Sequence, residues 1–252
     1  MARGTIAPVV IQWLARGMGD VPSSGEWLAP AESARLAGLR FPKRRSELRL
    51  SRWTAKLALA AALGLDDDAG ALAGIEIRPA EMGAPIAFVR EQPAPVAVSL
   101  TGRADWAVCV VAPSGLAVGC DLELVEPRTD RFARDWLTPA EQDLVSGAAS
   151  GDEEQVLANL VWSAKESALK ALRTGLRRST RSVEVEVVDR AGHERWARLR
   201  VRAEEGLSFH GWWRRYGDFL LTCAAGADCD PPVSIEDPPR LAGATPSHSW
   251  LS

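Results

Sequence analysis

The spacing of hydrophobic positions divides the first half of the chain into a helical part and a strand-rich part. Pro30 favours a helix start, Gly38 interrupts the helical pattern, and a second helix is predicted over residues 44–63. Apolar runs predict strands at residues 6–14, 96–100, 106–112 and 116–125. The turn at 113–115 indicates that the last two strands form a hairpin or lie side by side.

The second half repeats the order of helices followed by strands, without a close sequence repeat. Helical patterns cover residues 129–136, 138–149 and 152–173, and short strands are predicted at 183–188, 195–201, 207–213 and 219–225. Thr138-Pro139-Ala140-Glu141 is a capping box with Pro at the first helical position. The Pro- and Ser-rich segment from Asp230 predicts a disordered tail. We therefore expect an N-terminal half (1–125), a C-terminal half (126–229) and a tail (230–252).

Composition is typical of a soluble globular protein and excludes several classes. The chain has 252 residues, 46% of them hydrophobic, and a net charge of −3, so no basic field indicates nucleic-acid binding. The first apolar run is too short for a membrane span and lacks the layout of a signal peptide. The four cysteines show no C-x-x-C spacing, which favours buried reduced thiols in a cytoplasmic protein. The three histidines form no zinc-binding pattern.

Two carboxylates stand on one face of a predicted strand. Asp121 and Glu123 are two positions apart in VGCDLE (118–123), so their side chains point the same way. Two like charges held together favour a hard divalent cation between them. The alternative is a solvent-facing edge strand, because alternation of apolar and acidic residues is common in half-buried strands.

Lysine is rare in this chain, yet two of its four lysines flank a glutamate in WSAKESALK (162–170). Trp162, Lys165, Glu166 and Lys170 share one helix face with Leu169. An ordinary i,i+4 salt bridge from Glu166 to Lys170 is one interpretation. Ammonium groups that bind phosphate oxygens are the other.

A second helix presents a continuous basic stripe. Arg45, Arg49, Arg52 and Lys56 follow i, i+4, i+7 and i+11 spacing. A stripe of one sign repels itself, which favours an anionic partner, although a solvated basic face is the alternative. Acids for a divalent metal and bases for phosphates together indicate phosphoryl-group chemistry. No P-loop and no kinase signature set is present.

These motifs, in this order, resemble those of the 4′-phosphopantetheinyl transferases, in particular the long type that activates surfactin synthetase. VGCDLE and WSAKESALK are similar to the two signature motifs of that family. Four further segments resemble family motifs: the basic region at 44–56, EMGAP (81–85), VSLTGR (98–103) and WLTPAE (136–141).

The resemblance implies an α+β fold of two similar α/β halves related by a pseudo-twofold axis, with the active site between them. It also implies transfer of 4′-phosphopantetheine from coenzyme A to a serine of an apo acyl or peptidyl carrier protein, with release of 3′,5′-ADP. The implied Mg²⁺ ligands, with Mn²⁺ as an alternative ion, are Asp121, Glu123 and Glu166. Glu141 matches the general base, and Lys165 and Lys170 match the motif lysines. The residues implied to bind coenzyme A are Arg45, Arg49, Arg52, Lys56, Ser99, Thr101 and Lys170.

The chain departs from the family pattern at three positions. Leu100 stands where the family commonly has histidine, Ser51 where glycine is frequent, and Ala84 where some members have lysine. We expect a cytoplasmic monomer whose partners are coenzyme A and a carrier protein, with no nucleic acid and no membrane. The alternatives are a relative that binds coenzyme A or a carrier protein without turnover, and a phosphotransferase that acts on a small molecule.

Overall fold

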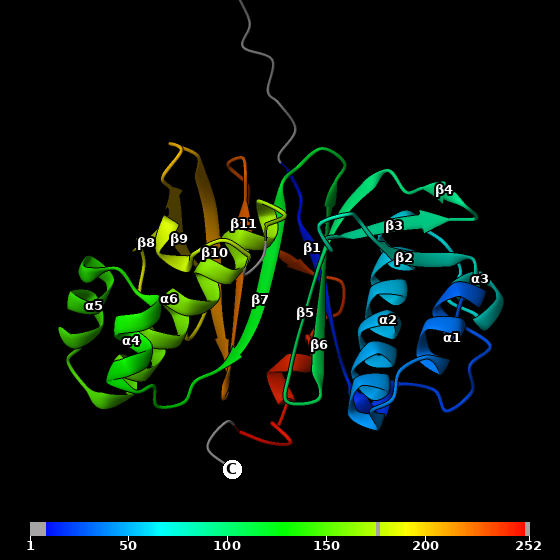
Figure 1. Ribbon diagram of the computed structural model, residues 1–252, viewed down its shortest axis with the longest axis horizontal. Coiled ribbons are helices and arrows are strands. Elements are labelled where there is room, and N and C mark those ends of the chain that lie inside the picture. The colour runs from blue at the N-terminus through cyan, green and yellow to red at the C-terminus, as the bar shows by residue number, and fades with distance from the viewer. Residues whose placement is uncertain (1–8, 175–176, 250–252) are drawn as a thin grey trace, which may run out of the picture.

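The computed structural model describes residues 9–174 and 177–249, and it confirms the predicted α+β class. The helices α1–α3 lie on one flank of the central strands and α4–α6 on the opposite flank (Figure 1). Each flank, with the strands nearest to it, forms one half of the molecule.

The N-terminal half builds its sheets around one long helix. Its main sheet has the order β12-β1-β6-β5, and a smaller sheet has the order β2-β3-β4. The strands are β1 (Gln12–Gly17), β2 (Ile75–Pro79), β3 (Pro85–Val89), β4 (Gln92–Pro93), β5 (Val96–Arg103), β6 (Trp106–Pro113) and β12 (Val233–Ser234). The helices are α1 (Pro30–Ala37), α2 (Pro42–Leu63) and α3 (Ala69–Ala73), with one-turn 3-10 helices at Met18–Asp20 and Arg240–Gly243. The two helices predicted between residues 30 and 63 are confirmed.

The C-terminal half, which in the structure begins at Val118, has one sheet where the N-terminal half has two. Its single sheet has the order β7-β11-β10-β9-β8. The strands are β7 (Val118–Leu124), β8 (Val183–Val187), β9 (Ala197–Ala203), β10 (Ser208–Tyr216) and β11 (Phe219–Ala225). The helices are α4 (Asp130–Trp136), α5 (Pro139–Ser146) and α6 (Gly151–Ala171), with a 3-10 turn at Thr180–Ser182.

A buried glutamate–lysine pair occurs at the same place in each half. Lys56 of α2 contacts Glu32 of α1, and Lys165 of α6 contacts Glu141 of α5, both with N–O distances of 2.7 Å. Each glutamate follows a matching Pro-Ala dipeptide, and each lysine ends a Trp-(Thr/Ser)-Ala-Lys sequence at the same spacing. The two halves therefore share these two short motifs at the same spacing, although the chain has no close sequence repeat.

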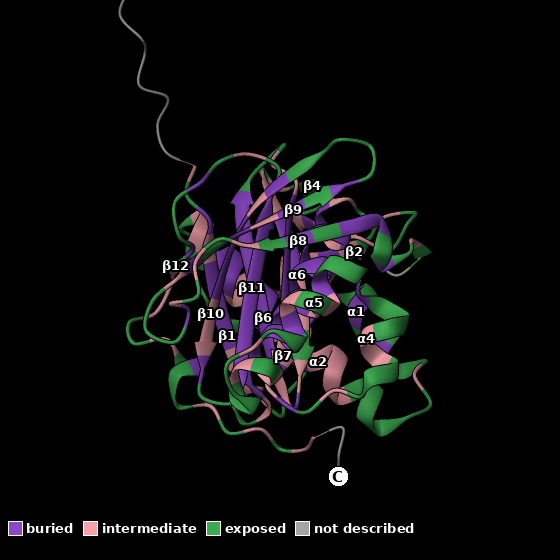
Figure 2. Cartoon of the chain, turned by 90° about the vertical axis from the view of Figure 1, so that its left-hand side faces the viewer, coloured by how far each residue is buried: buried purple, intermediate pink, exposed green. Residues whose placement is uncertain are grey.

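The two halves share one hydrophobic core between their sheets. Trp13 of β1 lies against Tyr216 of β10 with ring centroids 5.5 Å apart, and both are buried. Strand β11 is buried along its whole length (Figure 2). Because this shared core fixes one half against the other, residues from both halves can form a single site at the junction.

At that junction β5 and β7 belong to different sheets, and side-chain hydrogen bonds connect them. The Ser99 hydroxyl accepts a hydrogen bond from the Cys120 amide at 3.0 Å, and the Thr101 hydroxyl accepts one from the Leu122 amide at 3.2 Å. Strand β5 of one half is thereby held against β7 of the other.

Three sequence expectations differ from the structure. Residues 106–112 pair with β1 and β5 rather than with β7, because Ala104 and Asp105 adopt left-handed conformations that close a two-residue turn between β5 and β6. The predicted strand at 6–14 is found at Gln12–Gly17, and residues 6–8 lie outside the described residues.

The third difference is that residues 230–249 are ordered where a disordered tail is predicted. Strand β12 pairs in parallel with β1, Leu241 is fully buried, and Arg16 forms a 2.6 Å ion pair with Glu236. A few anchors suffice to order a Pro-rich segment, because proline already restricts its unfolded conformations. None of the helices in the described residues is both long and apolar enough to span a membrane.

Candidate active site

Asp121 lies on β7 where the two halves meet. Its Oδ1 accepts hydrogen bonds from Thr101 of β5 at 3.0 Å and from the Lys170 ammonium of α6 at 2.7 Å. Its Oδ2 is buried and has no hydrogen-bond partner. Gly119 allows this approach, because a Cβ at residue 119 would lie 1.9 Å from the Ser167 carbonyl oxygen of α6. The Asp121 side chain is thus held through Oδ1, and Oδ2 is left to accept a ligand.

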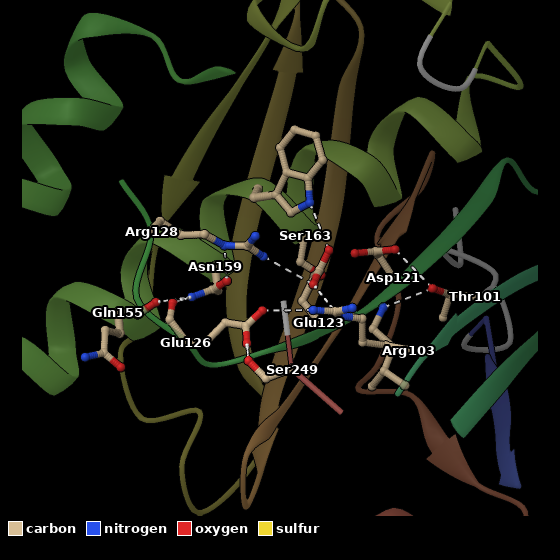
Figure 3. Close-up of polar contacts among 12 residues, drawn as sticks. Thr101, Arg103, Asp121, Glu123, Glu126, Arg128, Gln155, Asn159, Ser163 and Ser249 are labelled. Atoms are coloured by element: carbon tan, nitrogen blue, oxygen red, sulfur yellow. Dashed lines mark hydrogen bonds and ion pairs between the residues drawn. The ribbon is translucent and has the colours of Figure 1, made fainter. Parts of the chain in front are cut away.

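Glu123 is held by an indole and two guanidinium groups (Figure 3). Trp162 donates its indole N–H to Glu123 Oε1 at 3.0 Å, and Arg103 and Arg128 each lie 3.3 Å from Oε2. Burial, followed by the nearby Asp121 charge, raises the pKa of Glu123, and Arg128 and Arg103 oppose that rise. These contacts explain why Trp162 lies on the same helix face as the charged residues.

Glu166 of α6 is the third carboxylate, and its Oε1 is buried without a hydrogen-bond partner. Burial, and then the charges of Asp121 and Glu123, raise the pKa of Glu166 to about 7, with Lys170 opposing the rise. The three predicted ligands therefore act on one another electrostatically. A buried carboxylate with an unsatisfied oxygen is costly unless a cation neutralises it.

The donor set fits a hard divalent cation, although the side chains are not closed around one. No group of three His, Cys, Asp or Glu residues within 9–174 and 177–249 has an arrangement recognised as a metal site. The two unpartnered oxygens of Asp121 and Glu166 are nevertheless of the kind that Mg²⁺ prefers.

Lys170 joins the acids to the smaller of two neighbouring cavities. Its ammonium donates to the Cys120 carbonyl at 3.0 Å and to Asp121, so its ion-pair partner is Asp121 rather than Glu166. Burial lowers the pKa of this lysine, but the charge and hydrogen bond of Asp121, together with the effects of Cys120 and Glu166, outweigh that and raise it overall. Lys170 therefore stays cationic beside the carboxylates.

Two cavities open on either side of the Asp121–Lys170 pair, and Leu100 lines both. The larger, of about 680 Å³, is lined by Asp121 and Glu123 together with Lys43, Arg44 and Thr101. The smaller, of about 250 Å³, is lined by the loop Met82–Pro85 with Ser99, Lys170 and Arg173. Ser99 and Thr101 thus border the cavities while their hydroxyls tie β5 to β7.

The structure places Glu141 and Lys165 inside the C-terminal half, away from both cavities. Glu141 is 1% exposed, and its oxygens accept hydrogen bonds from the amides of Thr138 and Val185 as well as contacting Lys165. Lys165 also donates to the carbonyls of Thr180 and Val183. The predicted base therefore has no exposed oxygen for an incoming hydroxyl, and its role as a base stays a prediction from the resemblance.

The basic stripe is divided between internal contacts and the surface. Lys56 is fully buried and Arg52 is 8% exposed, and both face Glu32 rather than a cavity. Arg49 donates to the Ser24 carbonyl at 2.9 Å, and Arg45 donates to the Leu39 carbonyl at 2.6 Å. The anion predicted for the stripe is thus, in part, a carboxylate of the same chain.

Sequence reasoning missed several residues of the site. Lys43 and Arg44 are next to the predicted stripe, but they lie on the helix face that lines the larger cavity. Arg103, Arg128 and Glu126 surround Glu123 (Figure 3). The Glu126-Pro127-Arg128 sequence was the available signal, because a charged pair directly after the acidic strand can reach back to it.

Comparison with known proteins identifies the part of the chain that carries this geometry. Residues 117–224 match the model of the 4′-phosphopantetheinyl transferase superfamily. The match includes Asp121, Glu123, Glu166 and Lys170. Residues 117–224 are thus similar to a domain of this superfamily. The surfactin-activating subtype implied by the resemblance remains a prediction.

Among curated proteins, none matches the chain. One similar solved structure is a holo-(acyl-carrier-protein) synthase from Bacillus anthracis in complex with CoA (3′,5′-ADP), with 22% identity, a TM-score of 0.36, and coverage of 42% of this chain and 97% of that one. Another is the holo-[acyl-carrier-protein] synthase of Thermotoga maritima, with 19% identity, a TM-score of 0.32, and coverage of 50% and 73%. These scores are too low for the likeness to support an argument about the site.

Proposed function

We propose that the protein transfers the 4′-phosphopantetheine group of coenzyme A to a serine of an apo acyl or peptidyl carrier protein and releases 3′,5′-ADP. The main support is the cluster of Asp121, Glu123 and Glu166 beside Lys170, with two buried carboxylate oxygens left unpartnered. Such a cluster suits a metal-bound pyrophosphate, and it lies within the segment that matches the transferase superfamily.

Asp121, Glu123 and Glu166 would hold Mg²⁺ or Mn²⁺ in this proposal. When bound, the ion would neutralise charge on the phosphate oxygens. The chain's own residues supply the rest. Lys170 keeps a positive charge beside Asp121, and Arg103 and Arg128 orient Glu123. Trp162 fixes the other Glu123 oxygen through its indole N–H.

Coenzyme A would lie across the Asp121–Lys170 pair. The smaller cavity, lined by the Met82–Pro85 loop and by Ser99, would take the nucleotide end, because the resemblance implies that Ser99 binds coenzyme A. The pyrophosphate would lie at Lys170, and the pantetheine arm would extend into the larger cavity. Lys43 and Arg44, which line that cavity, would attract the phosphates of the ligand.

The direct test is intact-mass analysis of apo carrier proteins from fatty-acid, polyketide and non-ribosomal peptide systems after incubation with coenzyme A and Mg²⁺. A phosphopantetheine mass added to at least one carrier supports the proposal, and no addition across the panel contradicts it.

Leu100 supplies no polar donor to either cavity, which favours a module that binds coenzyme A without turnover as the second candidate. Coenzyme A binding without transfer to any carrier would select that candidate. The cytoplasmic location and the monomeric state stay predictions.

A further inference from the structure

The segment Ala244–Ser249, here called the strap, leads from the core between the halves to the larger cavity. Leu241, three residues before it, is fully buried in the core between the halves, and Ala244 packs against the same core. The indole N–H of Trp106 donates to the Thr245 carbonyl at 3.2 Å. His248 and Ser249 then line the cavity that Asp121 and Glu123 also line. The strap is therefore anchored at its start and ends at the candidate active site.

At its end the strap places a serine hydroxyl against a buried carboxylate (Figure 3). The Ser249 hydroxyl donates to Glu126 Oε2 at 2.5 Å. Glu126 is only 7% exposed, and its Oε1 accepts a 2.8 Å hydrogen bond from Arg103. Its backbone is also fixed, because the fully buried Asn159 donates to the Glu126 carbonyl at 2.7 Å. This is a rigid carboxylate with one oxygen turned toward a hydroxyl.

The same carboxylate is linked directly to the proposed metal ligands. Arg103 contacts Glu126 with Nη2 and Glu123 with Nε, so one guanidinium joins the two glutamates. A hydroxyl held at Glu126 is thus next to the charged groups that would hold the pyrophosphate. Glu141, in contrast, contacts Thr138, Val185 and Lys165, which all lie inside the C-terminal half.

We propose that Glu126 receives the hydroxyl of the acceptor serine, and that the strap fills this acceptor position with Ser249 until a carrier protein displaces it. This inference rests on the proposed function. In the transfer step, the acceptor Oγ forms a bond to the β-phosphorus of coenzyme A. The bond from that phosphorus to the bridging oxygen breaks, the oxygen leaves with 3′,5′-ADP, and the hydroxyl proton passes to Glu126.

The strap is tested by steady-state kinetics with a carrier protein that the wild-type enzyme modifies. Ser249→Ala should lower the KM for the carrier about three- to tenfold at unchanged kcat, because the open acceptor position becomes more populated. Trp106→Phe, which removes the donor to Thr245, should shift KM in the same direction. Ser247→Ala is the matched control, because its hydroxyl contacts only the neighbouring His248 ring in the described strap. A higher KM in Ser249→Ala would overturn the strap and make it part of the docking surface.

The role of Glu126 is tested in the same assay. Glu126→Gln should lower kcat by about a hundredfold or more, with the KM for coenzyme A unchanged, and Glu126→Asp should restore part of the loss. Glu154→Gln, a change at an exposed carboxylate of α6, is the control and should match wild type. An unchanged kcat in Glu126→Gln overturns the assignment. If Glu126→Gln does not fold, the kcat of Glu126→Asp decides instead.

The outcomes separate the two proposals. If the wild-type enzyme modifies no carrier protein, the proposed function is refuted. If the wild-type enzyme modifies a carrier protein but Ser249→Ala leaves the KM for that carrier unchanged, only the role of the strap is refuted.

Discussion

The two halves of the molecule have the same framework but different chemistry. In each half a glutamate at the third position of a short helix accepts its own N-cap amide and the amide of a later strand, and it contacts a fully buried lysine of the long helix. Burial lowers the pKa of Lys56 and of Lys165 alike, against the effect of their glutamates. The N-terminal half has this glutamate–lysine pair without the acids of the candidate site. We therefore assign the pair to the framework of the fold.

The differences lie one helix turn and one strand away from that pair. In α6 the residues after Lys165 include Glu166 and Lys170, whereas the matching positions of α2 are Leu57 and Ala61. On the central strands, Asp121 pairs in register with Thr222 of the β10–β11 hairpin, and the matching position on β1 is the buried Leu14. The site thus arises from a few substitutions on one copy of a duplicated scaffold. Four predictions test this division between framework and site.

The largest expected effect is on activity, at the acids that the N-terminal half lacks. Asp121→Asn should reduce transfer to the carrier more than a thousandfold, because it removes a metal ligand and the partner of Lys170. Initial rates at saturating coenzyme A measure this effect. Asp130→Asn, at the exposed first turn of α4, is the control, and a rate in Asp121→Asn within tenfold of wild type would contradict the account.

The next effect is on stability, and it should be equal in the two halves. Lys56→Met and Lys165→Met each leave a buried glutamate without its cation, which costs about 3–5 kcal/mol of unfolding free energy. Urea denaturation of the two variants measures the cost. A different result would contradict this account. If Lys165→Met keeps wild-type stability but loses transfer, and Lys56→Met loses neither, then the Glu141–Lys165 pair is catalytic and the two pairs are not equivalent.

A smaller effect, of opposite sign, is expected at Glu166. Its folded pKa of about 7 lies above the unfolded value, so the metal-free protein loses stability as pH rises from about 4.5 to 7. Glu166→Gln should therefore raise the free energy of unfolding by about 1–3 kcal/mol at pH 8 in EDTA, a range that allows for partial solvent screening. Thermal melts at pH 8 and pH 4 check this, and a variant that is less stable than wild type at pH 8 would contradict the burial argument.

The smallest effect distinguishes two basic residues close together on α2. Lys43→Ala should weaken coenzyme A binding about three- to tenfold, because Lys43 lines the larger cavity. Arg45→Ala should leave the Kd unchanged, because Arg45 donates to the Leu39 carbonyl at the surface. Isothermal titration at two salt concentrations measures both. Equal weakening by the two changes would restore the predicted basic stripe as the binding surface.

Much of the fold follows from local signals in the sequence. The helices at Pro30–Ala37 and Pro42–Leu63 have Pro at or near their starts and Gly after their ends, and such signals depend only on neighbouring residues. The pairing of β6 was predicted wrongly, because the left-handed turn at Ala104 and Asp105 carries no glycine to reveal it.

The site was predicted in part, for a related reason. Asp121, Glu123 and Glu166 are recognisable because acids at these spacings suit a cation. Arg103 could not be assigned, because its contact with Glu123 depends on how two sheets meet rather than on spacing along one element. For the basic stripe on α2, helical spacing identified the shared face correctly. It could not reveal that part of this face is buried against Glu32 of α1, which forms ion pairs with two of its cations.

The most direct test of the central claim is Mn²⁺ binding followed by electron paramagnetic resonance in the presence of coenzyme A. The account predicts one bound ion per chain in wild type and in Ser247→Ala. It predicts that this ion is lost in Asp121→Asn and in Glu166→Gln, although both variants stay folded. Retention of the ion in both variants, or no bound ion in wild type, would contradict the claim that these carboxylates form the metal and phosphate site.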